Sequence, residues 1–160
     1  MKTLSKSRFV SGIQCDKKLW FDFYRKELKP EIDDQTQAVF DLGHRIGILA
    51  QEMFPNGKDA TPEDYSKLKP SIENTKKWIS EKVQTIYEAT FSAKNAFCML
   101  DILHRKDEEA WAIEVKSSTS VKDYHFTDAS LQYFVMKNAG LAPDRFFMMH
   151  INNQYVRQGE

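Results

Sequence analysis

The stretch WAIEVKSST, residues 111–119, holds two charged side chains in a run that is otherwise apolar or small. Side chains of a β-strand alternate between the two faces of a sheet, so Glu114 and Lys116 would point to the same side. Burial of a carboxylate and an ammonium group is costly unless both groups are paired. The two residues therefore either satisfy each other as an ion pair or serve a chemical purpose.

Strand-like segments lie on both sides of this stretch. Residues 84–91 (QTIYEATF), 95–103 (NAFCMLDIL), 110–118 (AWAIEVKSS) and 145–151 (RFFMMHI) are short and contain many β-branched or aromatic residues. We predict that each is a strand. The charged residues 105–109 (RKDEE) are predicted to form a hairpin turn between the second and third strands.

Helical spacing of apolar residues dominates the first half of the chain. We predict one helical segment from Ser5 to about Tyr24 and a second over residues 35–54. The second segment has one apolar side, which we expect to face the core. That side consists of Val39, Leu42, Ile46, Leu49, Ala50 and Met53.

A third helical region is predicted within residues 61–83 from its end signals. Thr61 is a suitable N-cap, with Pro62 as the first helical residue. Pro70 would interrupt this helix, and Ser71 would cap its continuation.

A last helix is predicted over residues 127–140, with Thr127 as its N-cap and Gly140 at its end. Its apolar side comprises Leu131, Phe134 and Val135. Helices, a three-strand meander, a helix and a returning strand predict an α/β fold, with a central mixed sheet of about four strands flanked by helices.

Length and composition set the outer bounds. The 160 residues are predicted to form a single domain, helical over about 1–82 and with its sheet over about 83–155. Lys plus Arg and Asp plus Glu both number 23, so a nucleic-acid surface would have to be a local patch. We found no signal peptide or membrane-spanning run and expect a cytoplasmic protein without a membrane partner. The ending NNQYVRQGE adds no closing element, so we expect a fragment of a longer protein with a further C-terminal domain.

A possible site combines the second and third predicted strands. A hairpin would lay Asp101, which follows the apolar run AFCML, beside Glu114. Two converging carboxylates repel each other unless a cation lies between them. Oxygen ligands suit a hard ion such as Mg²⁺ or Mn²⁺, which can bind a phosphodiester oxygen and activate water. Lys116 would orient that water or help to deprotonate it, and would offset transition-state charge.

An ordinary α+β interaction domain explains the same residues without chemistry. Asp101 would then only end a strand, and Glu114 and Lys116 would lie on the exposed face of a one-sided sheet. This alternative predicts that both are solvent-exposed and that Asp101 is distant from them. In the metal-site interpretation, replacing Glu114 by Ala is expected to leave the fold nearly intact.

The pattern MLD, 12 residues, then EVK resembles the core of the PD-(D/E)XK nuclease superfamily. The segment DASLQYFVMKNAG resembles the helix of its RecB-like branch that carries a Gln, here Gln132. The opening segment SKSRFVSGIQCDKKLWFDFY is similar to the first helix of that branch, which includes the RecB nuclease domain and the CRISPR-associated four-cysteine exonucleases. These relatives act in DNA repair and defence.

The resemblance implies a restriction-endonuclease-like core and Mg²⁺- or Mn²⁺-dependent cleavage of DNA, with single strands or ends preferred. It makes Asp101, Glu114 and the Val115 carbonyl metal ligands and Lys116 the catalytic lysine. Gln132 would hold a phosphate or a water molecule; the alternative is an exposed helix residue. Glu88 could reach the same ion from the preceding strand; the alternative is an edge or solvent-facing position.

Two departures from the family pattern bear on activity. In GHRIG (43–47), Gly47 stands where relatives usually have a metal-binding His. His44, one turn back, either substitutes in part or is a surface residue. Met136 stands where the Gln helix often has a Tyr. The alternative function is therefore a catalytically inactive nuclease-fold module that binds nucleic acid or a protein partner.

The N-terminal segment raises two further questions. Relatives with four cysteines hold an iron–sulfur cluster through an N-terminal Cys and three C-terminal ones. Cys15 and Cys98 are the two cysteines of this sequence, so no cluster is expected within it. Basic residues beside Trp20, Phe21 and Tyr24 could follow a phosphate backbone while the rings stack on bases, although solvated helix faces look the same.

Overall fold

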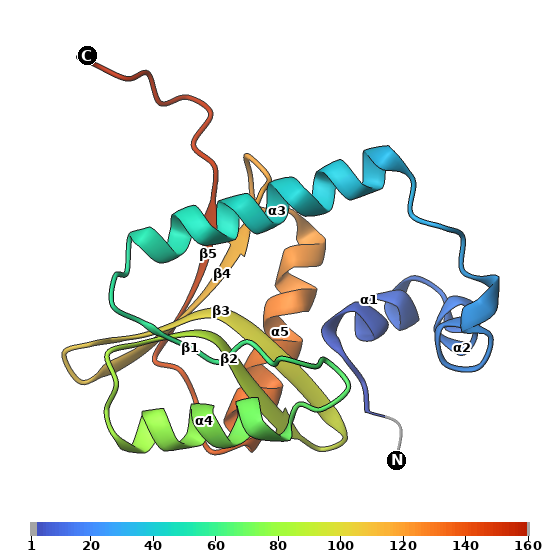
Figure 1. Ribbon diagram of the computed structural model, residues 1–160, viewed down its shortest axis with the longest axis horizontal. Helices are drawn as coiled ribbons and strands as arrows, with labels where there is room; N and C mark the ends of the chain where they lie inside the picture. The colour runs from blue at the N-terminus through green and yellow to red at the C-terminus, as the bar shows by residue number, and fades with distance from the viewer. Residues whose placement is uncertain (1–2, 160) are drawn as a thin grey trace.

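A computed structural model describes residues 3–159. Its centre is a mixed sheet with the strand order β1-β2-β3-β4-β5 (Figure 1). The neighbours β2–β3 and β3–β4 are antiparallel, whereas β1–β2 and β4–β5 are parallel. The bounds are β1 Lys58–Asp59, β2 Thr85–Ala93, β3 Ala96–Lys106, β4 Glu109–Lys116 and β5 Arg145–His150.

The prediction of an α/β fold with a mixed sheet is confirmed, but the expected count of about four strands is too low. The four predicted strands are β2 to β5. The strand that the sequence does not signal is β1, which has two residues, Lys58 and Asp59. Two residues are too few for an alternating pattern to be recognised.

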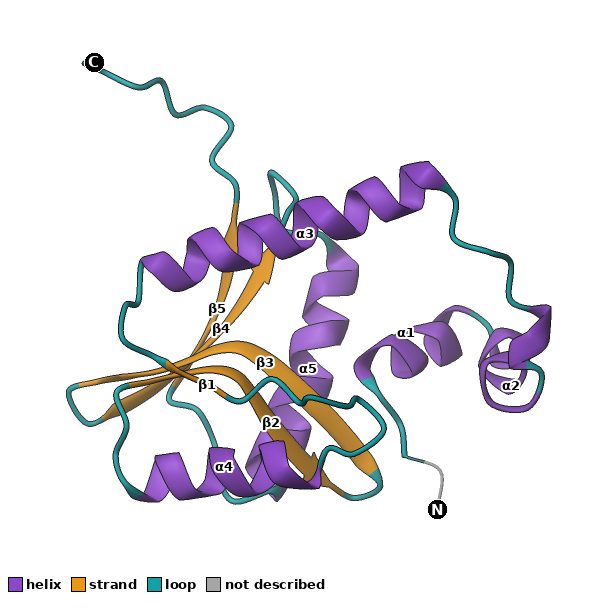
Figure 2. Cartoon of the chain, in the orientation of Figure 1, coloured by secondary structure: helices purple, strands orange, loops and turns teal. Residues whose placement is uncertain are grey.

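Five α-helices accompany the sheet within the described residues (Figure 2). They are α1 Lys6–Gln14, α2 Asp16–Tyr24, α3 Asp34–Glu52, α4 Lys69–Ser80 and α5 Asp123–Asn138, and a 3₁₀ turn, η1, spans Lys26–Leu28. Helices α4 and α5 pack on one face of the sheet, and α3 packs on the other. No helix of residues 3–159 is long and apolar enough to cross a membrane.

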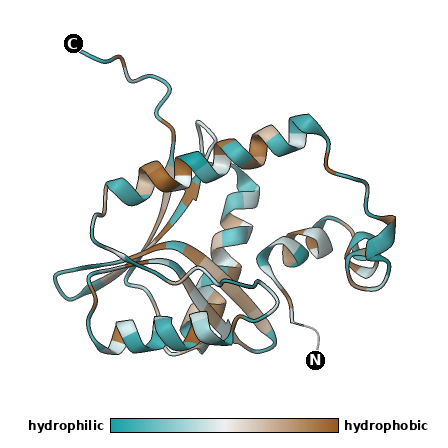
Figure 3. Cartoon of the chain, in the orientation of Figure 1, coloured by the Kyte–Doolittle hydropathy of each residue, from teal (hydrophilic) through white to brown (hydrophobic). Residues whose placement is uncertain are grey.

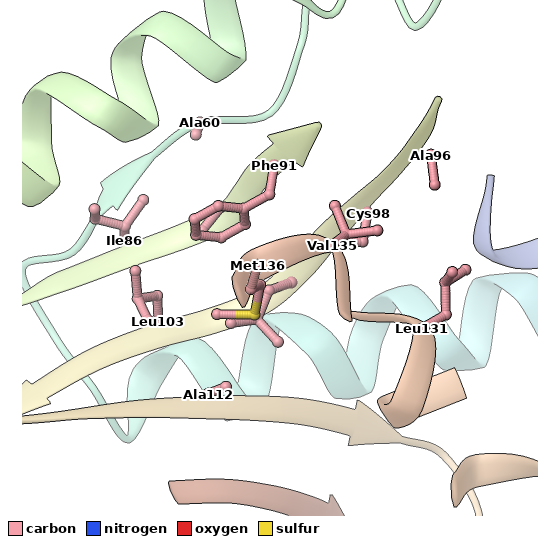
Figure 4. Close-up of a cluster of buried hydrophobic side chains, with 12 residues drawn as sticks. Ala60, Ile86, Phe91, Ala96, Cys98, Leu103, Ala112, Leu131, Val135 and Met136 are labelled. Atoms are coloured by element: carbon pink, nitrogen blue, oxygen red, sulfur yellow. The ribbon is translucent and has the colours of Figure 1, made fainter. Parts of the chain in front are cut away.

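The main hydrophobic core lies between the sheet and helices α4 and α5 (Figure 4). Val135 and Met136 of α5 are fully buried there against Leu100 of β3 and Ile86 of β2. A smaller cluster of Ala50, Ile102 and Ile113 lies on the other face, under α3. Because side chains pack on both of its faces, the sheet is a rigid support for the site.

The N-terminal helical segment differs from its prediction because Cys15 interrupts it. Its backbone is extended, with φ −168° and ψ 119°, so α1 ends and α2 begins at this residue. Ser5 caps α1, since its side-chain oxygen accepts a hydrogen bond from the Arg8 N–H. The chain turns between α1 and α2, and both helices lie to one side of the sheet (Figure 1).

The predicted helix start at Thr61 is wrong. Residues 61–68 are not helical, and α4 begins at Lys69 after Leu68. Pro70 lies within the first turn, where a missing N–H costs no hydrogen bond, so it starts the helix instead of breaking it. Ser71 is inside the helix and buried.

The last helix begins four residues earlier than predicted, at Asp123. Thr127 is therefore an internal residue and not the N-cap. The His125 ring accepts a hydrogen bond from the Lys122 N–H at 3.2 Å and closes the N-terminal end in its place. Gly140 follows the helix with φ +102°, as expected of a glycine that ends it.

The apolar side predicted for α3 is mostly exposed. Val39, Leu49 and Met53 are 61%, 54% and 69% exposed, and Ala50 is the one buried residue of this helix. Figure 3 shows brown, hydrophobic segments along α3. The helix meets the sheet near its C-terminal end, where Ala50 and Phe54 pack on Ile102 and Ile113.

Candidate functional site

The side-chain alternation of two neighbouring strands breaks at Glu88 and at Asp101. Ile86 and Ala89 of β2 share the main core although they are three residues apart, and so do Leu100 and Leu103 of β3. Regular strands would place such pairs on opposite faces. The ladder pairs Tyr87 with Ile102 and Ala89 with Leu100, so Glu88 and Asp101 stand opposite each other at the irregularity.

The backbone of Glu88 adopts φ +51° within the strand. A left-handed conformation at a residue other than glycine costs about 1–3 kcal/mol, and such residues cluster at functional sites. The strain gives an acidic side chain a direction that a regular strand would not offer. The sheet bends sharply along β3 in this region (Figure 1).

Asp101 lies where β3 and β4 separate. The antiparallel ladder between these strands runs from Lys106–Glu109 to Ile102–Ile113. The Val115 N–H then donates to Asp101 Oδ2 at 2.6 Å, so a side chain takes over where the backbone ladder ends. This contact holds Asp101 next to the Glu114–Lys116 segment, as the hairpin argument predicts.

Glu114 is at the centre of the site and is 1% exposed. Its Oε1 accepts hydrogen bonds from Lys116 Nζ at 2.7 Å and from Lys6 Nζ at 2.6 Å. Its Oε2 accepts from Gln132 Nε2 at 2.7 Å. Because Glu114 is buried and Asp101 is held beside it, the interpretation of an exposed polar strand face is wrong.

Two side chains of the site were not predicted from the sequence. Asp128 Oδ2 accepts from Lys116 Nζ at 2.7 Å, and Lys6 reaches Glu114 from the first residue of α1. Asp128 and Gln132 are four residues apart on α5 and so share one helix face, which was an available signal. Lys6 is 108 positions from Glu114 and has no local signal.

The lysines keep Glu114 ionised. Burial alone would raise the pKa of this carboxyl, but the nearby Lys6 and Lys116 outweigh burial and lower it. In turn, burial opposes the charge on Lys116, while Glu114 and Asp128 overcome it and raise the pKa of Lys116. Lys116 is therefore an ammonium group, which can donate hydrogen bonds and offset negative charge but does not accept a proton from water.

The pKa values of the other two predicted acids shift in the opposite direction. Burial and repulsion by Glu114 raise the pKa of Asp101 well above its usual range. Burial and repulsion by Asp59 raise the pKa of Glu88 to about 7. Four carboxyl groups, counting Glu114 and Asp128, thus surround two lysines, and ionisation of Asp101 and Glu88 is disfavoured unless a further cation joins them.

Glu88 and Gln132 were each predicted either to join the site or to be exposed, and both are at least partly buried. Gln132 is fully buried on α5 and is not an exposed helix residue. Glu88 lies on β2, one residue beyond Ile86 and Tyr87, which pair with β1. It is partly buried and close enough to feel the charges of Lys6 and Glu114.

The residues suit a hard divalent cation by their chemistry, but not in their present arrangement. Among residues 3–159, no group of three His, Cys, Asp or Glu side chains is arranged to hold a metal ion. Carboxylate oxygens are nevertheless the ligands that Mg²⁺ and Mn²⁺ prefer. Neighbouring carboxylates also repel each other unless a cation lies between them. Gln132 Oε1 is also buried and has no hydrogen-bond partner among the described residues, so an unpaired acceptor lies beside Glu114. The Val115 carbonyl remains a predicted ligand.

The residues at which the sequence departs from the nuclease pattern are not among the side chains that hydrogen-bond to Glu114 in the described part of the chain. Gly47 is on α3, and a Cβ added there would meet nothing within 4 Å. His44 is exposed on the same helix, and Met136 is fully buried in the main core. Cys15 is exposed and Cys98 is buried, and both are free thiols.

Comparison of the chain with protein-family models gives no match, and comparison with curated proteins gives none either. The resemblance to PD-(D/E)XK nucleases therefore remains a prediction from its motifs.

Proposed function

We propose that the chain is a Mg²⁺- or Mn²⁺-dependent nuclease of the PD-(D/E)XK type, RecB-like branch, that hydrolyses phosphodiester bonds of DNA. The observation that carries the proposal is the meeting of Asp101, Glu114 and Lys116 in one buried, acid-rich centre. Residues of a structural ion pair would need no second and third carboxylate beside them. Single strands or ends are the preferred substrates by resemblance to the family.

Each side chain has a distinct role in this proposal. Asp101, Glu114, the Val115 carbonyl and Glu88 would hold the ion. The ion supplies Lewis acidity and lowers the pKa of a bound water. Lys116, held at 2.7 Å by Asp128, donates to the scissile phosphate and offsets the charge that develops on it. Gln132 orients Glu114 through its Nε2 and offers Oε1 to a water proton.

A basic groove along α1 and α2 supports nucleic acid as the partner. It encloses about 1470 Å³ between α1, α2, η1 and the loop that precedes α4. Its basic lining residues are Arg8, Lys17, Lys18, Arg25, Lys26 and Lys29, whereas Asp22 is its one acidic lining residue. In a chain without net charge, this is the local patch that phosphate binding requires. Phe21 adds an aromatic ring on which a base can stack.

One observation favours the inactive binding module as a second candidate. Both oxygens of Glu114 are already engaged, by Lys6, Lys116 and Gln132, so the centre is satisfied without a metal ion. A module of this kind would bind nucleic acid through the same basic groove and would leave the strand intact.

Cleavage of an end-labelled single-stranded DNA oligonucleotide in Mn²⁺ separates the two candidates. The wild type should cleave it, and Lys116→Met should be slower by a factor of about 100 or more. Lys76→Met, which removes an exposed lysine of α4, is the matched control and should cleave at the wild-type rate. Tight binding by the wild type without cleavage would favour the module. Duplex DNA and RNA of the same sequence test the substrate preference.

A further inference from the structure

Lys6 brings a second ammonium group into the buried centre. It is the first residue of α1, and its Nζ lies 2.6 Å from Glu114 Oε1. Lys116 Nζ lies 2.7 Å from the same oxygen. Two positive charges thus share one carboxylate oxygen, although like charges repel and the Glu114 carboxylate has a single negative charge.

The two lysines are not held equally. Lys116 is on β4 and has a second carboxylate, Asp128, at 2.7 Å. Lys6 is 4.0 Å from Asp128, so Glu114 is its one close partner. Lys6 also stands at the N-terminus of α1, where the positive end of the helix dipole disfavours a cation. Of the two ammonium groups, Lys6 has the fewer carboxylates within hydrogen-bond distance.

A divalent cation at Asp101 and Glu114 needs the place that Lys6 holds. Both the ion and Lys6 would contact the same carboxylate, whose Oε1 already accepts hydrogen bonds from two ammonium groups. The Lys6 side chain is 29% exposed, whereas that of Glu114 is 1% exposed, so Lys6 has a path outward. Ser5, Ser7 and Arg8 line the basic groove, whereas Lys6 is on the side of α1 that faces Glu114.

We propose that Lys6 substitutes for the divalent cation in the metal-free centre, and that cation binding releases it toward the substrate phosphate beside Lys116. Lys6 is then a positioning residue for two successive partners. In the free protein it keeps Glu114 paired and in place. In the loaded protein it contacts the substrate phosphate beside Lys116. This inference rests on the proposed nuclease function, because it assumes that Asp101 and Glu114 bind the ion.

Calorimetric titration of Mn²⁺ without nucleic acid tests the exchange directly. Lys6→Met removes the competitor while Lys116 and Gln132 still pair with Glu114, so the fold should survive. We expect it to bind Mn²⁺ at least tenfold more tightly than the wild type. Lys6→Arg, which retains the charge, and Lys76→Met, the surface control, should keep the wild-type affinity. A lysine with a purely structural role would lower the melting temperature without raising Mn²⁺ affinity.

The oligonucleotide provides the second readout. Lys6→Met should cleave it at least tenfold more slowly than the wild type when Mn²⁺ is saturating, with Lys6→Arg partly restored.

Four results are informative. Tighter Mn²⁺ binding by Lys6→Met, with or without measurable binding by the wild type, supports the exchange. Equal or weaker binding by a folded Lys6→Met, beside clear binding by the wild type, overturns the exchange and leaves the proposed function standing. Tighter Mn²⁺ binding with undiminished cleavage overturns the transfer of Lys6 to the phosphate. Absence of Mn²⁺ binding from both proteins overturns the metal centre and the exchange together.

Discussion

Helices α3 and α5 lie on opposite faces of the same sheet and are buried to very different extents. The 19-residue α3 has the clearer apolar periodicity and buries one residue, Ala50. The 16-residue α5 buries six residues, and three of them are polar: His125, Asp128 and Gln132. The helix with the weaker apolar pattern is the better packed one.

Polar contacts explain the difference. Gln132 and Asp128 face the sheet because Glu114 and Lys116 provide them with charged partners. Val135 and Met136 continue the same face into the main core. Helix α3 has no such partners over its first half and meets the sheet near Ala50. Charge pairing fixes α5, whereas α3 relies on a small apolar contact.

The largest expected effect is on the α5 side, from Glu114→Ala. The sequence led us to expect an intact fold, because it showed Glu114 without partners. The structure reverses that expectation, since the substitution leaves Lys6 and Lys116 buried without their shared carboxylate. We expect a loss of about 3–5 kcal/mol in the free energy of unfolding. Urea denaturation at pH 7 measures it, and a loss below about 1 kcal/mol would mean that the site relaxes freely.

The pH dependence of stability tests the buried state of Glu88. A carboxyl whose pKa rises on folding stabilises the fold fully below its unfolded value, and this contribution is lost as pH rises through the folded value. For Glu88 the window runs from 4.5 to about 7. Between pH 5 and pH 8 the wild type should therefore lose about 2 kcal/mol more than Glu88→Gln does.

Asp101 contributes to the pH dependence with the same sign, because burial and Glu114 raise its pKa. Glu88 is a smaller cause of that shift, so Glu88→Gln retains most of the Asp101 contribution of the wild type. Glu73→Gln, an exposed substitution on α4, serves as the control and should follow the wild-type curve. Identical pH curves for the wild type and Glu88→Gln would show that Glu88 is ionised and solvated in the folded protein.

Gln132→Ala should have an intermediate effect. It leaves Glu114 Oε2 without its donor, and an unsatisfied buried acceptor costs about 1–3 kcal/mol. Gln37→Ala on α3 provides the comparison, since Gln37 bonds to Asp41 on the exposed surface. Equal melting temperatures for the two variants would remove the distinction between the helices.

How far the sequence predicts this molecule depends on which contacts are local. The four longer strands, the turn after Lys106 and the meeting of Asp101 with Glu114 all follow from patterns within a few residues or across one hairpin. The positive φ of Glu88 does not, because the bend of the sheet as a whole selects it.

Contacts between distant segments account for the remaining differences. Lys6 enters the site from more than a hundred positions away, and only the folded chain brings α1 to β4. The exposure of α3 has the same origin, since periodicity identifies an apolar side and cannot say whether anything covers it. Asp128 is the one residue of the site that helix spacing from Gln132 would have revealed.

Leu49→Ala on α3 should have the smallest effect. Leu49 belongs to the predicted apolar side but is 54% exposed, so its truncation should change the free energy of unfolding by about 0.5 kcal/mol or less. The same urea experiment measures it. A loss of 2 kcal/mol or more would mean that this side of α3 is covered in solution.

The most direct test of the metal centre is Mn²⁺ binding at pH 7.5 by the wild type and by Asp101→Asn, with a short single-stranded oligonucleotide present. The substitution keeps an oxygen for the Val115 N–H and removes the carboxyl group that can ionise when the ion binds. We predict saturable binding by the wild type, weakened at least tenfold by Asp101→Asn. Equal binding by both proteins, or none by the wild type, would contradict the assignment of Asp101 and Glu114 as metal ligands.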